Sequence, residues 1–285
     1  MTPDRLDEIA TRLAAAHRGA KPVAWQTTAE GLELADAYGL QDRVRDMLDA
    51  GARATAWKVS PPRAGSASVA APVPNACCVA SPARLAATDF SMLGVEVEIA
   101  FRFGRDLPRR AGHHPQHPVR DAAQVRDAAE VLEAAEVREA AGAFDAAEVL
   151  DAVDTLLVAL ELCDTRLAAW RDAPPLWKLA DFQSSGALVI GTAVRDWVGI
   201  DFGSLLAQLV VNGEVRAEAR GSHPSGDPSV LLPWLAGHVA QRCGGLRRGD
   251  VVTTGTWTGM HFVAPGDVVE ARFPGLGEAR LQLVA

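Results

Sequence analysis

Apolar and polar positions follow two different periods along the chain. Near the N-terminus, residues 4–18 and 28–51 place apolar side chains three or four positions apart, which is typical of amphipathic helices. Gly51 fits just past the end of the second helix, where a glycine commonly adopts the left-handed conformation. Residues 94–103 (GVEVEIAFRF) instead alternate with the two-residue period of a strand. The pattern therefore predicts a helical start followed by a change to strands.

Strands dominate the rest of the chain. They are expected at residues 54–60, 94–103, 155–167, 186–194, 208–219, 250–259 and 266–285. Asn212-Gly213 predicts a hairpin turn, residues 227–245 a helix, and residues 61–76 a loop because of their Pro and Gly content. Strands and helices do not alternate regularly, so a doubly wound parallel sheet is not expected. We expect an α+β fold, a mixed β-roll with a helical N-terminal segment packed on it.

A six-residue repeat between Arg120 and Val149 breaks the strand pattern. Six residues advance a helix by roughly 240°, so its valines spiral around the axis and form no apolar stripe. We therefore expect a low-complexity surface insertion at about 109–143, of little catalytic relevance, with the last copy feeding the fold. Around it, residues 1–70 are expected to form the helical segment and 71–285 the catalytic domain.

Composition and charge narrow the class of protein. Of 285 residues, 48% are hydrophobic and 22% charged, which are the values of a globular domain. The formal net charge of -8 argues against nucleic-acid binding, which needs clustered Lys and Arg. No stretch resembles a secretory signal or a membrane span, and the four cysteines lack zinc-knuckle spacing. A cytoplasmic protein with reduced thiols is expected.

Two acids stand inside an otherwise apolar strand. Alternation puts Glu96 and Glu98 on one face, with Cα atoms roughly 6.6 Å apart, so both carboxylates can reach one cation. On these two residues alone, a solvated face of an antiparallel sheet is the favoured alternative. Glu161 changes this balance, because its neighbours over residues 156–162 are apolar and leave it no obvious wet face. Three carboxylates suit Mg²⁺ or Mn²⁺ better than Zn²⁺.

Several motifs, taken in order, resemble those of one known family. They are DAYGLQ, WKV, VEVEIAFRFGRDLP, ALELCDTRL, LADFQSSGALVIG and LRRGDVVTTGTWTG followed by PGD. Together they resemble the 2-keto-4-pentenoate hydratase group of the fumarylacetoacetate hydrolase superfamily, from about Leu32 to the end except for the insertion. That superfamily has a mixed β-roll of the fumarylacetoacetate hydrolase C-terminal type.

The resemblance implies roles for particular residues. It implies metal ligands at Glu96, Glu98 and Glu161, an acid–base group at Lys58, proton shuttling and substrate binding at Asp181, Ser184 and Ser185, and a pocket position at Trp257. A nearby cation would also lower the pKa of a lysine toward a useful value. The chain departs from the family pattern at SPPRAG after the lysine, at Phe182-Gln183 and at Trp257. These departures concern the substrate pocket and leave the acids intact.

The resemblance implies a metal-dependent lyase that adds water to a small 2-hydroxy-2,4-dienoate or 2-oxo acid, as in aromatic ring-cleavage catabolism. Three alternatives remain: a decarboxylase of the same family, a carbon–carbon hydrolase, and a non-catalytic binding or assembly homologue. The hydrolase needs a histidine base, and none can be assigned in the sequence. We expect a homo-oligomer, with a partner enzyme of the same pathway as a further option, and neither a nucleic-acid nor a membrane partner.

Overall fold

The computed structural model describes residues 1–27, 31–62, 67–108 and 144–285. The helices are α1 (Pro3–His17), α2 (Leu34–Leu48), α4 (Ala146–Asp151), α5 (Pro175–Ala180) and α6 (Leu232–Cys243), and a short turn, η5, spans Phe182–Ser184. The strands of the larger sheet are β1 (Ala56–Ser60), β2 (Val69–Val73), β3 (Cys78–Ala80), β5 (Gly94–Phe103), β7 (Val153–Cys163), β8 (Ser185–Val194), β12 (Val251–Thr256) and β13 (His261–Phe262). The smaller sheet holds β4 (Ala83–Ala86), β9 (Leu206–Val211), β10 (Glu214–Arg220), β14 (Val268–Phe273) and β15 (Gly277–Val284), and β6 (Leu107–Pro108) pairs with β11 (Gly245–Leu246).

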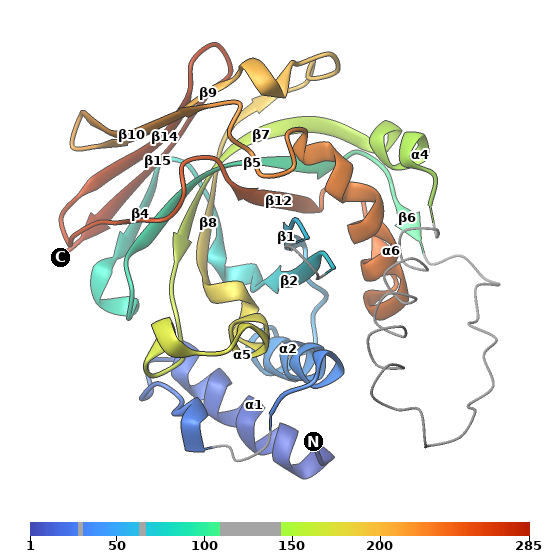
Figure 1. Ribbon diagram of the computed structural model, residues 1–285, viewed down its shortest axis with the longest axis vertical. Helices are drawn as coiled ribbons and strands as arrows, with labels where there is room; N and C mark the ends of the chain where they lie inside the picture. The colour runs from blue at the N-terminus through green and yellow to red at the C-terminus, as the bar shows by residue number, and fades with distance from the viewer. Residues whose placement is uncertain (28–30, 63–66, 109–143) are drawn as a thin grey trace.

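Both sheets are mixed, and they face each other (Figure 1). The larger sheet has the order β2-β1-β12-β5-β7-β8-β3, with β13 added to β5, and the smaller one the order β10-β9-β14-β15-β4. Most pairs are antiparallel, whereas β1 with β12, β3 with β8 and β4 with β15 are parallel. The expected α+β roll of mixed strands is confirmed, and no parallel doubly wound sheet forms within the described residues.

The main core lies between the sheets and under α6. Alternate residues of β5 point into it, from Val95 to Phe103, and β7 contributes Leu156, Val158, Leu160 and Leu162. Apolar residues at every second position of a strand share one face, so the intervening residues of both strands must face the other way. That opposite face carries the polar residues discussed below.

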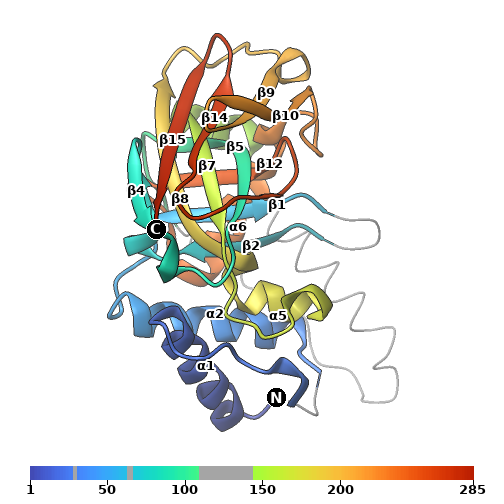
Figure 2. The same ribbon diagram turned by 90° about the vertical axis from the view of Figure 1, so that its left-hand side faces the viewer.

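The helical N-terminal part packs at one end of the larger sheet. Helix α1 packs on α2 and α2 on α5, and together they bury a second apolar cluster (Figures 1 and 2). The second N-terminal helix ends at Leu48, whereas the helical segment was expected to reach residue 70. Strand β1 and the first residues of β2, which lie between these positions, belong to the larger sheet. Within the described residues, no helix is both long enough and apolar enough to cross a membrane.

Two expectations about loops have different outcomes. The prediction that residues 61–76 form only a loop is wrong, because Val69–Val73 pairs with β1 as strand β2. Pro72 lacks a backbone N–H and is tolerated there because β2 is the edge strand. The insertion expected at about 109–143 lies outside the described residues. Phe144, directly after it, is buried in the main core as predicted.

Candidate active site

Glu96 and Glu161 face each other across the two central strands. They are register partners on β5 and β7, which run antiparallel. Directly opposite residues lie on the same face of a sheet, so the two carboxylates share the face that points away from the main core. Glu98 lies two residues further along β5 and shares that face. Glu98 and Glu161 are fully buried, whereas Glu96 is half-buried and lies nearer to solvent.

Lys58 enters the same space from β1. Its neighbours Trp57 and Val59 point into the main core, so alternation turns Lys58 toward the acids. Its Nζ lies 2.7 Å from Glu161 Oε1 and donates a second hydrogen bond to the carbonyl oxygen of Gln183 at 3.2 Å. The side chain is 8% exposed. The structure thus pairs the predicted acid–base group directly with a predicted metal ligand.

Burial and mutual repulsion set the protonation of this cluster. Burial alone would lower the pKa of Lys58, but the surrounding carboxylates, above all Glu161, outweigh it and raise that pKa above its usual value. Burial, together with the charge of Glu161, raises the pKa of Glu98 well above normal, and burial raises the pKa of Glu96. Lys58 is therefore held as an ammonium ion among acids that resist carrying full charge.

The carboxylate of Glu98 is anchored on one side only. Its Oε2 accepts hydrogen bonds from Thr253 Oγ1 and from the backbone N–H of Gly255 on β12. Its Oε1 is buried without a hydrogen-bond partner among the described residues, as is Oε2 of Glu161. Unpaired buried acceptors are costly, and a cation would satisfy both.

Glu96, Glu161 and Cys163 can each offer a ligand atom within 4.8 Å of the others. This group could hold a divalent cation if the side chains closed slightly, since two ligands on opposite sides of one ion stand roughly 4–4.6 Å apart. The predicted trio was Glu96, Glu98 and Glu161. In this group the third member is Cys163, whereas Glu98 is hydrogen-bonded to β12. The thiol was missed in the sequence because isolated cysteines are common, and only the register places this one beside Glu96.

A left-handed turn lies beside Lys58. Phe182, Gln183 and Ser184 in η5 have φ values of 50°, 53° and 58°, which residues with a Cβ rarely adopt. This turn presents the Gln183 carbonyl to Lys58, and Ser60 Oγ donates to Oε1 of the same Gln183 at 2.7 Å. Backbone strain of this kind concentrates at functional sites, so we add Gln183 to the candidate residues. Its φ could not be read from the sequence.

The two predicted serines differ in their surroundings. Ser185 on β8 is the register partner of Cys163 and is buried, with an Oγ that has no hydrogen-bond partner among the described residues. It therefore lies beside the acid cluster as a ready donor. Ser184 Oγ accepts a hydrogen bond from Trp170 Nε1 at 2.9 Å, which fixes its orientation.

Asp181 is fully engaged in a buried ion pair. Its Oδ1 lies 2.5 Å from Arg166 Nε, and its Oδ2 accepts from Thr165 Oγ1 and from the Arg166 backbone N–H. The same guanidinium binds the backbone carbonyls of Asp181 and Ser185. This geometry favours a positioning role for Asp181, since it locks both ends of η5, over the predicted role in proton transfer.

Trp257 lies in the main core and not beside the acids. It packs against Phe273 and His223 and is 2% exposed. The cause is a bulge in β12, where Thr253 pairs opposite Ala100 but Thr256 opposite Glu98. One extra residue inverts the alternation, so Trp257 turns to the opposite face of the sheet. Trp257 therefore lies on the opposite face from the acids, and its predicted contact with substrate stays an expectation.

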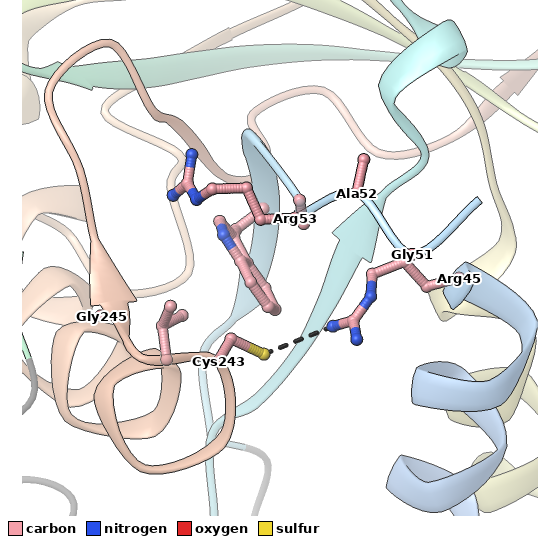
Figure 3. Close-up of a pocket in the computed structure, with 9 residues that line it drawn as sticks. Arg45, Gly51, Ala52, Arg53, Cys243 and Gly245 are labelled. Atoms are coloured by element: carbon pink, nitrogen blue, oxygen red, sulfur yellow. Dashed lines mark hydrogen bonds between the residues drawn. The ribbon is translucent and has the colours of Figure 1, made fainter. Parts of the chain in front are cut away.

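A cavity of about 170 Å³ lies elsewhere, between α2, β1 and the end of α6 (Figure 3). Arg45 donates to Cys243 Sγ there at 3.4 Å, and Arg53 pairs with Asp250. Trp57 lines this cavity, while the next residue, Lys58, points to the opposite face of β1. The cavity is therefore separate from the acid cluster, and its two arginines are already paired with acids.

Comparison with known proteins places the chain in one family. Residues 131–284 match the fumarylacetoacetate (FAA) hydrolase C-terminal family, and the chain belongs to that family. It is 28% identical, over 99% of its length and 96% of theirs, to a 2-keto-4-pentenoate hydratase of Paraburkholderia xenovorans (strain LB400) and to 2-keto-4-pentenoate hydratase 3 of Pseudomonas putida. The family resemblance seen in the sequence is confirmed, as is the relation to hydro-lyases.

A solved structure supports the fold. The chain resembles 4-oxalocrotonate decarboxylase from Pseudomonas putida G7, complexed with magnesium and adipate, with a TM-score of 0.78 at 19% identity. The match covers 100% of this chain and 99% of that one. At this identity the likeness establishes the fold.

Proposed function

We propose that this protein is a divalent-metal-dependent hydratase of a small 2-hydroxy-2,4-dienoate or the corresponding 2-oxo acid. The observation that carries the proposal is the buried group of Lys58 and acids on the larger sheet, where Lys58 Nζ lies 2.7 Å from Glu161. The full-length hydratase relatives support the reaction class. A small 2-oxo acid is then the expected partner, and a homo-oligomer remains our expectation for the assembly.

The donor set suits a divalent cation, with Mg²⁺ or Mn²⁺ as the cofactor expected. Glu96 and Glu161 would hold it, with Glu98 contributing its unpaired Oε1. When bound, the cation would polarise the oxygens of the substrate's 2-oxo acid group and stabilise negative charge there. The 4-oxalocrotonate decarboxylase of known structure is complexed with magnesium in one structure and with calcium in another, which supports a divalent metal in this fold.

Lys58 is the group that would move the proton. Its Nζ holds a proton in the acid cluster and is oriented by the carbonyl of Gln183. A divalent cation bound to Glu161 would weaken the attraction between that carboxylate and the Lys58 ammonium ion. The pKa of Lys58 would then fall toward the pH at which the enzyme works. Lys58 Nζ could then deliver a proton to, or take one from, the carbon next to the 2-oxo group.

The bound substrate would lie between Lys58 and the η5 turn. Ser185 Oγ offers a free hydroxyl, and Gln183 Nε2 is a buried donor without a partner among the described residues. Both groups can bind carboxylate or hydroxyl oxygens. Buried apolar residues on the same face of the sheet, among them Ala100, Ala159 and Leu188, would exclude water from the side of the site away from the η5 turn.

A decarboxylase is the second candidate. A relative named 4-oxalocrotonate decarboxylase is 28% identical over 46% of this chain, and the structural neighbour of that name shares the whole fold. Water addition ranks first because the hydratase relatives match almost the full length.

Product analysis separates the two reactions. Purified protein with Mg²⁺ or Mn²⁺ is incubated with 2-hydroxypenta-2,4-dienoate or with 4-oxalocrotonate. Loss of the dienol absorbance with formation of a 4-hydroxy-2-oxo acid supports the hydratase. Release of CO₂ from the second compound without hydration of the first identifies a decarboxylase, and turnover of neither contradicts both assignments.

A further inference from the structure

The acid cluster contains a sulfur donor that neither the three-carboxylate pattern nor the reaction requires. Cys163 is the last residue of β7, two positions after Glu161, and is 3% exposed. It lies opposite Gly94 on one neighbouring strand and Ser185 on the other. Gly94 has no side chain on this face, where a Cβ would lie 3.3 Å from the Cβ of Cys163, and the Cys163 thiol lies within 4.8 Å of a Glu96 carboxylate oxygen.

We propose that Cys163 is a metal ligand, so that this site binds thiophilic divalent cations such as Zn²⁺ and Cd²⁺ through sulfur together with Glu96 and Glu161. The inference rests on the proposed metal site and deepens it by naming a class of ion that competes with Mg²⁺ or Mn²⁺. On binding, the thiol proton passes to solvent and the thiolate takes its place on the ion.

The geometry supports one shared ion. The ligand atoms of Glu96, Glu161 and Cys163 lie within 4.8 Å of one another. A zinc ion places oxygen ligands at about 2.0–2.2 Å and sulfur at about 2.3 Å, so the three side chains would move toward one another to close around it. The buried Oε2 of Glu161, which has no hydrogen-bond partner among the described residues, is an independent sign that an ion belongs there.

Ligand chemistry determines which ion benefits. Mg²⁺ prefers oxygen and gains little from sulfur, whereas thiolate selects softer ions. A site with two carboxylates and one thiolate is therefore expected to bind Cd²⁺ and Zn²⁺ more tightly than Mg²⁺. Zn²⁺ is expected to displace the activating ion and inhibit turnover at concentrations well below that of Mg²⁺.

The test uses Cd²⁺ as the probe and the full chain. Cd²⁺ bound to a thiolate gives an ultraviolet charge-transfer band, and its affinity is measured by titration. We expect the Cys163→Ser variant to lose the band at one equivalent and to bind Cd²⁺ roughly tenfold or more weakly, since even outer-shell losses cost about 10–100-fold. The Cys243→Ser and Cys78→Ser variants, each of which removes a half-buried free thiol elsewhere, should keep both the band and the affinity.

The outcomes separate the role of the thiol from the existence of the metal site. A band that is unchanged in Cys163→Ser, or Cd²⁺ binding with no band in the parent, overturns the role of the thiol while the metal site stands. Failure of Mn²⁺ to bind the parent, measured by electron paramagnetic resonance, overturns the proposed function as well. If Cys163→Ser does not fold, ¹¹³Cd NMR of the parent decides, because a shift of an all-oxygen site contradicts the inference.

Discussion

Lys58 Nζ lies 2.7 Å from Glu161 Oε1, although the two residues come from β1 and β7, the second and fifth strands across the larger sheet, with β12 and β5 between them. The pair joins the predicted proton carrier to a predicted metal ligand in a buried site. A divalent cation bound by Glu161 would change the protonation of Lys58, so under the proposed function metal binding and proton transfer would be coupled through this contact.

The first prediction concerns Lys58. Lys58→Met removes the proton carrier and an ammonium ion that competes with the metal for Glu161. Turnover should fall by about 10²–10⁴-fold, while the affinity for Mn²⁺ stays the same or rises. Exchange of the C3 proton of a bound 2-oxo acid, followed by NMR in deuterated water, isolates the step. Lys21→Met removes an exposed lysine and serves as the control. Exchange by Lys58→Met at the parental rate would assign the proton to another group.

The second prediction concerns Glu98. Burial and neighbouring acids disfavour its charge, so Glu98→Gln should leave the melting temperature of the metal-free protein equal or higher. Its amide oxygen can still accept from Thr253 and Gly255. Mg²⁺-dependent turnover should nevertheless be abolished, because a charged ligand is lost. Thermal unfolding and the rate are measured side by side, with Glu214→Gln as an exposed control. Full activity in Glu98→Gln would remove Glu98 from the metal site.

The third prediction concerns Asp181. Asp181→Asn removes the closer counter-charge of the buried Arg166 and leaves only the carboxylate of Asp164, 3.6 Å away, which should cost up to about 3–5 kcal/mol of unfolding free energy. Chemical denaturation measures this loss. If Asp181 acts only by positioning η5, the pH–rate profile of the variant keeps its parental shape at a reduced rate. A profile that loses one titrating limb with stability unchanged would instead make Asp181 an acid–base group.

The fourth prediction concerns stability in acid. Burial, with the nearby charge of Arg242, lowers the pKa of His238 to about 3. The unfolded chain binds the proton below about 6.5, so stability should fall as pH drops from about 6.5 toward 3, by up to about 1.4 kcal/mol per pH unit. His238→Gln keeps an acceptor for Arg242. In this variant the unfolding free energy should fall less steeply with decreasing pH, because the unfolded chain binds one proton fewer. An unchanged slope would mean that His238 is protonated in the fold. Burial also lowers the pKa of His17, so part of the slope remains.

Regular alternation made the central strand predictable. The sequence predicted β5 with its observed limits, and Glu96 and Glu98 on one face, because a two-residue period has one geometric meaning. Lys58 and Glu161 were also located by their motifs, and the structure brings both to that face. Local patterns sufficed wherever a strand stays regular.

Predictions from local alternation failed where the backbone is irregular. The bulge between Thr253 and Thr256 moved Trp257 to the core, and strand pairing turned Val69–Val73 from an expected loop into a strand. The place of Cys163 depends on register between distant segments, and the left-handed η5 turn depends on the Asp181–Arg166 ion pair. These features are set by tertiary contacts, which no local window contains.

Under the proposed function, a divalent metal bound at these acids drives hydration of a dienoate. The direct measurement is the rate of water addition to 2-hydroxypenta-2,4-dienoate by protein stripped with a chelator and then titrated with Mg²⁺ or Mn²⁺. Activity should be lost on stripping, return with one equivalent of bound metal per chain, and stay absent in Glu161→Gln. Hydration that persists without metal, or that Glu161→Gln retains in full, would contradict the proposed function.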